Sequence, residues 1–293
     1  MAVQLSSFAQ AILNGLLTGA LYALVGMGMA LIFGVMRIVN FAHGAFMVLG
    51  MYITYVLFDR LQINPYIGFL FAAAALFALG YVVYQGLLRW TAQRSEFMQL
   101  LLTIGLALII TDSIHLGFGA DYHQVNIPLL DVNVRLTDHI SLNAPWLLSF
   151  AITAVLATGM FLFVMKSRFG RAVRAIAQNR YAASLMGIDV LRIQALSFGL
   201  GLAAVGVAGG LLLPVFYLYP TAGDQFTLKA YVIVVLGGMG SIAGAAIAGI
   251  VLGVVENLTS LYWGNQWALV VDFVIFLLVL SLRPAGLFGI QRV

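Results

Sequence analysis

Long runs of apolar residues constrain this chain more than any other feature of its sequence. Most approach the roughly 20 residues that a helix needs to cross the hydrocarbon core of a bilayer. Because open sheet edges cannot be satisfied in lipid, we predict that every run is a helix. Nine spans fit the sequence, at about 11–34, 42–58, 65–88, 97–118, 145–165, 193–215, 222–237, 241–260 and 265–282. The second, seventh and eighth are short or rich in glycine, so eight or nine spans are expected.

The composition agrees with a membrane protein. Of the 293 residues, 63% are hydrophobic and 8% are charged, whereas a soluble domain carries about 25% charged residues. The longest connections, 119–144 and 166–192, fall below the roughly 50 residues of a small domain. The predicted fold is therefore all-α, a single polytopic transmembrane helix bundle over residues 1–293. The absence of cysteine excludes disulfides, Cys-ligated zinc and thiol catalysis.

Basic residues predict the orientation, because they accumulate in cytoplasmic connections. One connection, 166–192, is crowded with them, and others follow the third span and the last span. The segment 119–144 carries mainly acids, lies one span away from two of these places, and is expected to be periplasmic. The N-terminus is then outside and the C-terminus inside. The basic residues used here are Arg89, Arg94, Lys166, Arg168, Arg171, Arg174, Arg180, Arg192, Arg283 and Arg292.

Several kinds of chemistry are excluded by missing motifs. The sequence contains no GxxxxGK[ST] loop, so nucleotide energy has to come from another chain. It contains no GxSxG elbow and no soluble scaffold for a catalytic triad, so we expect no enzyme activity. The net charge of +4 is explained by lipid headgroups and a cytoplasmic partner rather than by nucleic acid.

The stretch RIVNFAHGAF, residues 37–46, places polar side chains between two apolar runs. Arg37 follows the first span and can extend to the lipid headgroups. Asn40 and His43 lie three residues apart, so on a helix they would share one face. We predict a broken or re-entrant element here, in which both side chains stabilise the break and face a translocation path. Hydrogen bonds between helices alone are an equal alternative. His43 lacks a second ligand at helical spacing, so no metal site is expected.

Four further ionisable residues fall inside or near predicted spans, where such residues are functional candidates. Asp112 and His115 are three residues apart and can pair with each other. Glu256 lies close to the expected outer face, where an interfacial position would suffice. Asp272 lies deeper in an apolar span, and we take it as a third candidate for the translocation path. Pairing of Asp272 with a neighbouring helix is the alternative.

Glycine is frequent inside the apolar segments, with 31 residues in all. Small residues at helical spacing let helix backbones approach closely in lipid. We therefore expect these glycines to pack the bundle rather than to line a pore. No internal repeat is convincing in the sequence.

The basic connection contains signals for short helices. The segment 166–190 alternates apolar and basic residues in a way that predicts a short amphipathic helix at the cytoplasmic face. Asn179 and Asp189 are candidates to cap helix N-termini, and Gly187 to end a helix. An ordinary positively charged loop in contact with anionic lipid is the simpler alternative. The functional interpretation is a docking element for a cytoplasmic protein.

Four segments together carry a resemblance to a known family. They are NGLLTGALYALVGMGMALIFGVMRIVNFAHGAFMVLG, GRAVRAIAQNRYAASLMGID, KAYVIVVLGGMGSIAGAAIAG and the closing RPAGLFG. In these segments the chain resembles the membrane-spanning permeases of ABC importers, specifically the high-affinity branched-chain amino acid permeases of the LivH type. The resemblance runs over nearly the whole chain and implies a type II-like importer fold in a bacterial inner membrane.

The resemblance also implies partners and a coupling element. These are a second, LivM-like permease chain, two cytoplasmic ATPases that would hold ATP and magnesium, and a periplasmic binding protein that delivers amino acids. No cofactor is implied for this chain. In such importers an EAA–x3–G loop docks into the ATPase, and the pattern is partial here, because tyrosine replaces the leading acid and the Ile-x-Leu-Pro portion is missing. The implied coupling residues are Arg171, Arg174, Tyr181, Ala182, Ala183 and Gly187.

Two other classes of function remain to be weighed. An ion-coupled secondary carrier of a small organic solute would use Asp112, His115, Glu256 and Asp272 as a proton relay. The basic connection argues against such a carrier, as does an expected absence of Lys or Arg deep in the later spans. A membrane anchor without transport activity would not need the polar break at residues 37–46.

Overall fold

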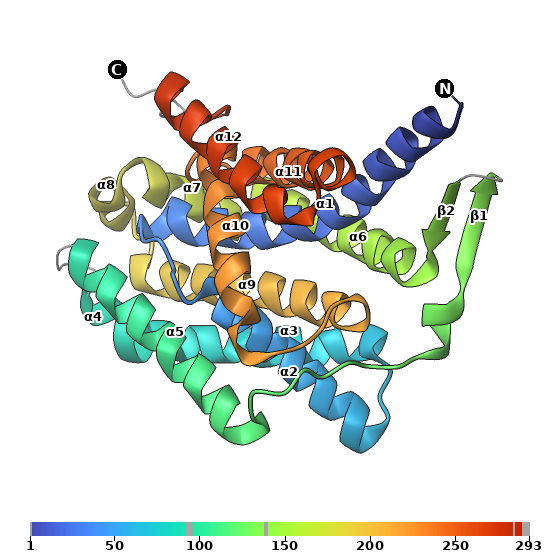
Figure 1. Ribbon diagram of the computed structural model, residues 1–293. Helices are drawn as coiled ribbons and strands as arrows, with labels where there is room; N and C mark the ends of the chain where they lie inside the picture. Colours follow the sequence, from blue (N-terminus) through green and yellow to red (C-terminus); the bar gives the residue numbers. More distant parts are fainter. Residues whose placement is uncertain (1, 92–95, 138–139, 284, 289–293) are drawn as a thin grey trace.

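The computed structural model describes residues 2–91, 96–137, 140–283 and 285–288, and most of them are helical (Figure 1). Eight helical segments in this part of the chain are long and apolar enough to cross a membrane. The predicted span 222–237 corresponds to the shorter helix α10 (Gly223–Gly237). The spanning helices are α1 (Ala2–Met36), α2 (His43–Leu61), α3 to α4 (Pro65–Thr91), α5 (Glu96–Phe118), α6 (Ala144–Lys166), α9 (Val190–Leu212), α11 (Ile242–Trp263) and α12 (Ala268–Leu282).

Helix boundaries follow local signals in the sequence. Gln62, in the left-handed conformation, ends α2. Asn64 caps α3 by accepting a hydrogen bond from the Tyr66 amide, and Pro65 follows at the first helical position. The third span then widens into a π-helical turn, η1 (Tyr84–Leu88), before it ends.

Glycines bring α1 and α11 into close backbone contact. A methyl group added at Gly19 would lie 2.8 Å from the Cα of Ile250, and one added at Gly249 would overlap Ala23. Gly15 and Gly253 make equally close approaches further along the same contact. For these glycines the expectation that they pack the bundle is confirmed.

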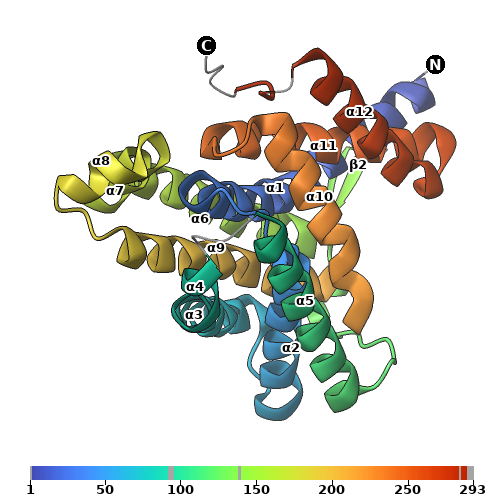
Figure 2. The same ribbon diagram turned by 90° about the vertical axis from the view of Figure 1, so that its left-hand side faces the viewer.

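Helix α9 lies at the centre of the molecule and is the most buried of the spanning helices (Figure 2). Its glycines face several neighbours. Gly199 and Gly206 approach the backbone of α3, Gly209 approaches α2, and Gly201 approaches α1. The core therefore forms around α9, with α1, α2 and α3 against it.

The helices form two related halves that the sequence does not reveal. Helix α1 packs along α11 as α9 packs along α3, and α2 contacts α9 as α10 contacts α1. The short helices α2 and α10 also contact each other and the helices that follow them. Since α1 and α9 cross the bundle in opposite directions (Figure 1), the segments α1–α2–α3–α5 and α9–α10–α11–α12 form an inverted repeat.

The segment 119–144 departs from the all-α prediction. It contains a 3₁₀ turn, η2 (Pro128–Asp131), and a small antiparallel hairpin of β1 (Asn133–Thr137) and β2 (Ile140–Asn143). The side chain of Gln10 exchanges two hydrogen bonds with the backbone of Ser141, at 2.8 and 3.0 Å. This exchange fixes the hairpin against the N-terminal part of α1.

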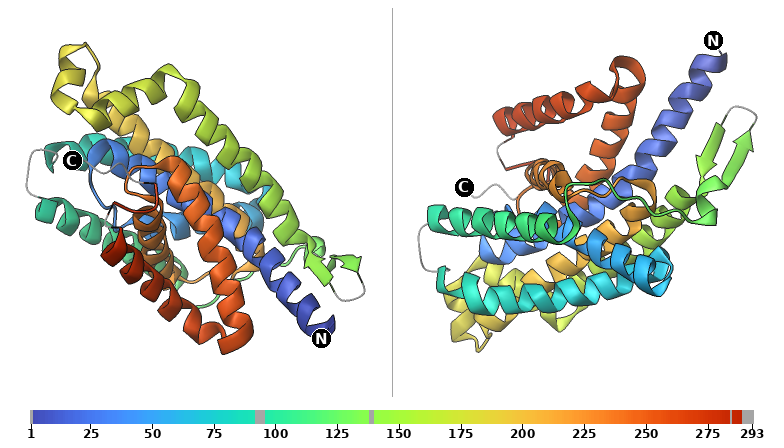
Figure 3. Two further views of the ribbon diagram at one scale, coloured as in Figure 1. Left: turned by 90° about the horizontal axis from the view of Figure 1, so that it is seen from above. Right: turned by 60° about the horizontal axis from the view of Figure 1, so that its bottom comes forward.

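The segment 166–192 folds into two short helices, α7 (Arg168–Gln178) and α8 (Arg180–Leu185). They lie at the opposite end of the bundle from the hairpin (Figures 1 and 3). The predicted caps are confirmed, because the Asn179 side chain accepts from the Ala182 amide and Asp189 accepts from the Arg192 amide. Gly187 ends α8 with φ of +80°. Arg94 and Arg292 lie outside the described residues.

Candidate functional site

The predicted break between the first two spans is present at residues 37–42. Arg37 leaves α1 in the left-handed conformation, with φ of +56°, and its side chain is exposed. The fully buried Asn40 closes the next turn, because its side-chain oxygen accepts from the Ala42 amide at 3.1 Å. Asn40 therefore precedes α2 instead of lying within it. The expectation that Asn40 and His43 share one helical face is wrong, since Asn40 forms the turn.

His43 is the first residue of α2 and is also fully buried. Its Nε2 lies 3.0 Å from the carbonyl oxygen of Val25 in α1. Because a carbonyl can only accept, Nε2 carries the proton. Nδ1 then has no hydrogen-bond partner among the described residues. The side chain thus links the start of α2 to the middle of α1.

The start of α2 crosses the start of α10 at very close range. The Gly44 amide donates to the Thr227 hydroxyl at 2.9 Å, and a methyl group at Gly44 would overlap the carbonyl oxygen of Gly223. The single hydrogen of the Thr227 hydroxyl has two acceptors within reach, the carbonyl oxygens of Gly223 at 3.2 Å and of Phe41 at 3.4 Å. The break is consequently coupled to α10 as well as to α1.

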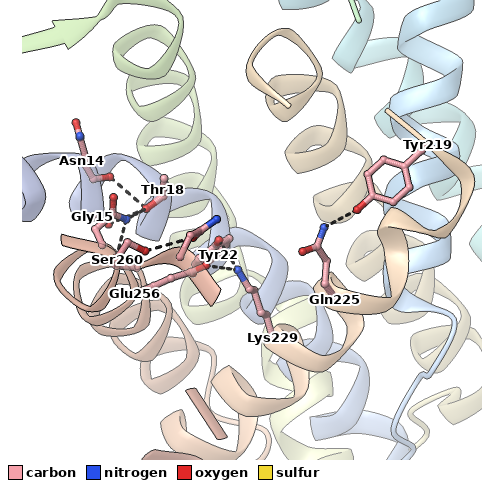
Figure 4. A network of polar contacts seen from close by, with 12 residues as sticks. Asn14, Gly15, Thr18, Tyr22, Tyr219, Gln225, Lys229, Glu256 and Ser260 are labelled. Carbon is pink, nitrogen blue, oxygen red and sulfur yellow. Dashed lines mark hydrogen bonds and ion pairs between the residues drawn. The ribbon is translucent and has the colours of Figure 1, made fainter. Parts of the chain in front are cut away.

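A buried ion pair lies on the other face of α10 (Figure 4). The Nζ of Lys229 is 2.5 Å from Oε1 of Glu256 in α11 and donates to the hydroxyl of Tyr22 in α1 at 2.8 Å. The two charged side chains are 10% and 15% exposed. Nearby, the Asn257 side chain donates to the Thr18 hydroxyl at 3.0 Å. Three helices are thus joined by one polar cluster.

Asp272 in α12 is buried beside this cluster, at 1% exposure, and interacts electrostatically with Glu256 and Lys229. Neither of its carboxylate oxygens has a hydrogen-bond partner among the described residues. Oε2 of Glu256 is likewise buried without one. One ammonium group therefore lies close to two buried carboxyl groups.

The sequence reasoning missed Lys229, and its expectation of no deep Lys or Arg in the later spans is wrong. Glu256 is also not a merely interfacial residue, because it is the ion-pair partner of Lys229. The signal was available, since Lys229 interrupts an apolar segment and carboxyl groups occur in the two spans that follow. Charges inside a membrane pair with one another, so these residues should have been considered together.

Asp112 and His115 do not pair with each other. Both side chains are exposed on the outer face of α5, and neither forms an ion pair or hydrogen bond with any residue that the structure describes. The other two residues of the carrier hypothesis, Glu256 and Asp272, lie in α11 and α12. The pairing suggested by the spacing of Asp112 and His115 is therefore wrong.

Helix α8 presents an exposed apolar surface. The side chains of Tyr181, Leu185 and Met186 are 73%, 70% and 83% exposed, and Ala182 is exposed beside them. Ala183 points the other way and is 4% exposed, packed with Val173 and other residues of the helix ends. A short helix of this kind, with one packed side and one free apolar side, is suited to contact another protein.

The predicted coupling residues on α7 have a different position from those on α8. Arg174 donates to the backbone carbonyl oxygens of Val164 and Met165, at 2.7 and 3.2 Å, and so caps the end of α6. Arg171 lies further out and donates weakly to the Lys166 carbonyl at 3.4 Å. Arg174 thus holds α7 on the bundle, while α8 carries the free surface.

A cavity of about 360 Å³ separates α8 from the break, and Arg37, Asn179, Arg180, Tyr181 and Gln194 line it. Gln194 in α9 is itself buried. It accepts from the Tyr84 hydroxyl at 2.7 Å and donates to the Val35 carbonyl at 3.2 Å. The cavity therefore borders α8 and the break, and Gln194 connects its wall to Tyr84 in the π-helical turn of the third span.

Comparisons with known proteins identify relatives of this chain. The family described as "Branched-chain amino acid transport system / permease component" matches residues 11–280. The high-affinity branched-chain amino acid transport system permease protein LivH of Escherichia coli K12 is 31% identical, covering 99% of this chain and 98% of the relative.

Two relatives from Methanocaldococcus jannaschii are more distant. The probable branched-chain amino acid transport permease protein LivH is 28% identical over 92% of this chain and 89% of the relative. The corresponding LivM protein is 24% identical over 64% and 58%. No solved structure gives a significant match. The chain belongs to the family of permease components of branched-chain amino acid transport systems.

Proposed function

We propose that this chain is one of two membrane-spanning permease subunits of an ATP-driven importer for branched-chain or related amino acids. The observation that carries the proposal is the exposed surface of α8, formed by Tyr181, Ala182, Leu185 and Met186, at the arginine-rich end of a bundle without a nucleotide-binding loop. A separate ATPase contacts this surface.

The complex contains a second, related permease chain, two cytoplasmic ATPases and a periplasmic substrate-binding protein. ATP and magnesium belong to the ATPases. The chain lies in a bacterial inner membrane with its N-terminus in the periplasm and its C-terminus in the cytoplasm. The positions of the hairpin and of α8 at opposite ends of the bundle support this orientation (Figure 1), because the basic residues cluster at the α8 end.

The mechanism is alternating access. Closure of the ATPase dimer moves α8. The cavity between α8 and residues 37–42 provides space into which α8 can shift toward the break. Asn40 closes the turn within the break, His43 links the break to α1, and Thr227 connects it to α10. The helix α10 carries Lys229, which faces Glu256 and Asp272. Asn40, His43 and Asp272 remain our candidates for residues that border the translocation path.

The two states have to be favoured by different ligands. A ligand shifts a conformational equilibrium only by the difference between its affinities for the two states. The loaded binding protein and ATP therefore stabilise different arrangements of the bundle. The family of the chain favours this mechanism over ion-coupled secondary transport.

Uptake measurements in cells test the proposal. We expect accumulation of labelled leucine to stop when the partner ATPase carries a mutation that abolishes hydrolysis. We also expect accumulation to continue when a protonophore collapses the proton gradient while cellular ATP is maintained. The opposite pattern would establish an ion-coupled carrier.

A further inference from the structure

The outward face of α5 carries polar groups where a lipid-facing helix should carry none. The side chains of Asp112 and His115 are exposed on this face and form no ion pair or hydrogen bond within the described chain. Asp112 lies six residues before the end of the helix at Phe118, which places it about 9 Å inside that end. A charged side chain within a membrane-spanning helix is costly unless it has a polar partner.

The same face also carries a small residue near the middle of the span. Gly105 lies seven residues before Asp112, hence on the same side of the helix. A methyl group added at Gly105 would contact nothing else in the described chain. Leu101, Leu108 and Leu116 flank this side and are 52%, 58% and 88% exposed. An open glycine between larger side chains is the arrangement that lets a second membrane helix approach closely.

Two other outward faces of the bundle, on α3 and α12, lack this combination. The exposed side chains of α3 between Ile67 and Val82 are all apolar, as are those of α12 between Leu269 and Leu280. Both are suited to lipid. Helix α5 therefore differs from these two outer helices in carrying an open glycine and ionisable side chains on one side.

We propose that this face of α5, formed by Leu101, Gly105, Leu108, Asp112, His115 and Leu116, is the contact surface for the second permease chain of the complex. The occupant has to be embedded in the membrane, because the face extends over most of the span. It also has to offer polar partners, since Asp112 accepts hydrogen bonds and His115 can donate or accept them. A chain of the same fold meets both requirements, and relatives of the LivH and LivM types occur in one organism.

The inference rests on the proposed function, because it requires a second permease chain. The chain contains no cysteine, so single-cysteine variants can be labelled without background. We would attach a photoactivatable benzophenone maleimide to Leu108→Cys in the purified complex. The matched control is Leu79→Cys, which is 37% exposed on the apolar face of α3.

We expect illumination to join Leu108→Cys to a permease chain, seen as a band at the summed mass and identified by peptide mass spectrometry. We expect Leu79→Cys to give no protein adduct. Adducts with lipid alone at Leu108→Cys, or with the ATPase or the binding protein, would overturn the inference. Met186→Cys, directly after α8, serves as a separate reporter in the same preparation. If Met186→Cys joins the ATPase while Leu108→Cys joins no permease, only the α5 surface is wrong.

A pair of glycine substitutions provides a second arm. Gly105→Leu should lower the yield of permease–permease adduct at least about tenfold, because it fills the space for the opposing helix. Gly159→Leu in α6 is the control, since Gly159 also has no neighbour within reach of an added methyl group. Both changes favour helix formation, so neither should unfold the chain. An equal yield in both variants would contradict the proposed surface.

Discussion

Lys229 is a buried charged residue, and substitutions around it should affect the stability of the chain. It lies between the carboxylate of Glu256 and the hydroxyl of Tyr22, with Asp272 beside the pair. A buried ion pair gains little net stability, but removing one partner leaves an uncompensated charge in the interior. The cluster should therefore tolerate the loss of both partners better than the loss of one.

A set of substitutions at this pair tests that expectation. Glu256→Gln alone should destabilise the chain by about 3–5 kcal/mol, because it leaves the Lys229 ammonium without its direct partner. The double variant Lys229→Met with Glu256→Gln should recover a large part of this loss. Thermal unfolding of the purified complex in detergent measures both. If the double variant is no more stable than Glu256→Gln alone, the pair is not coupled as described.

The short helix α8 is the element that carries the proposed docking surface. Helix α8 is held by the buried Ala183 and ended by Gly187 in the left-handed conformation, so its exposed side has a fixed direction. The resemblance assigned Ala183 to the contact with the ATPase. Because Ala183 is buried, it packs α8 against the bundle and cannot itself contact a partner in this conformation.

A prediction at this scale concerns Met186, the most exposed residue of the α8 surface. Met186→Asp should reduce substrate-stimulated ATP hydrolysis by the complex at least about tenfold, because a charge replaces an apolar contact in the interface core. Membrane insertion and thermal stability should not change, since the side chain is 83% exposed. The control is Arg180→Lys, which keeps the positive charge beside the α8 surface. Coupled hydrolysis in Met186→Asp equal to that of the unaltered complex would rule out this docking surface.

At the scale of the whole molecule, the apolar runs were sufficient to predict the helices and their approximate ends. Local signals also predicted the caps at Asn179 and Asp189 and the break after the first span, because each depends on neighbouring residues only. The contacts of α1 with α11 and of α9 with α3 could not be predicted. A glycine in a helix indicates that another helix can approach closely, but it does not indicate which helix does so. The inverted repeat was missed for the same reason.

The candidate site was predictable only in part. Asn40, His43 and Asp272 were identified because polar residues are conspicuous in apolar surroundings. Their partners, such as the Val25 carbonyl and Thr227, depend on which helices meet and on backbone atoms that no sequence pattern marks. The small hairpin β1–β2 could not be predicted from the apolar pattern, because the segment 119–144 lies outside it.

The central claim is that α8 faces the cytoplasm and is covered there by a separate ATPase. Labelling of single cysteines with a membrane-impermeant maleimide tests it directly, with Val134→Cys on the exposed part of β1 as the reporter for the opposite side. We predict that Met186→Cys reacts in inverted vesicles stripped of the ATPase and is protected when the ATPase is added back, while Val134→Cys reacts only from the outside of spheroplasts. Reaction of Met186→Cys from the outside, or reaction that bound ATPase does not reduce, would contradict the account.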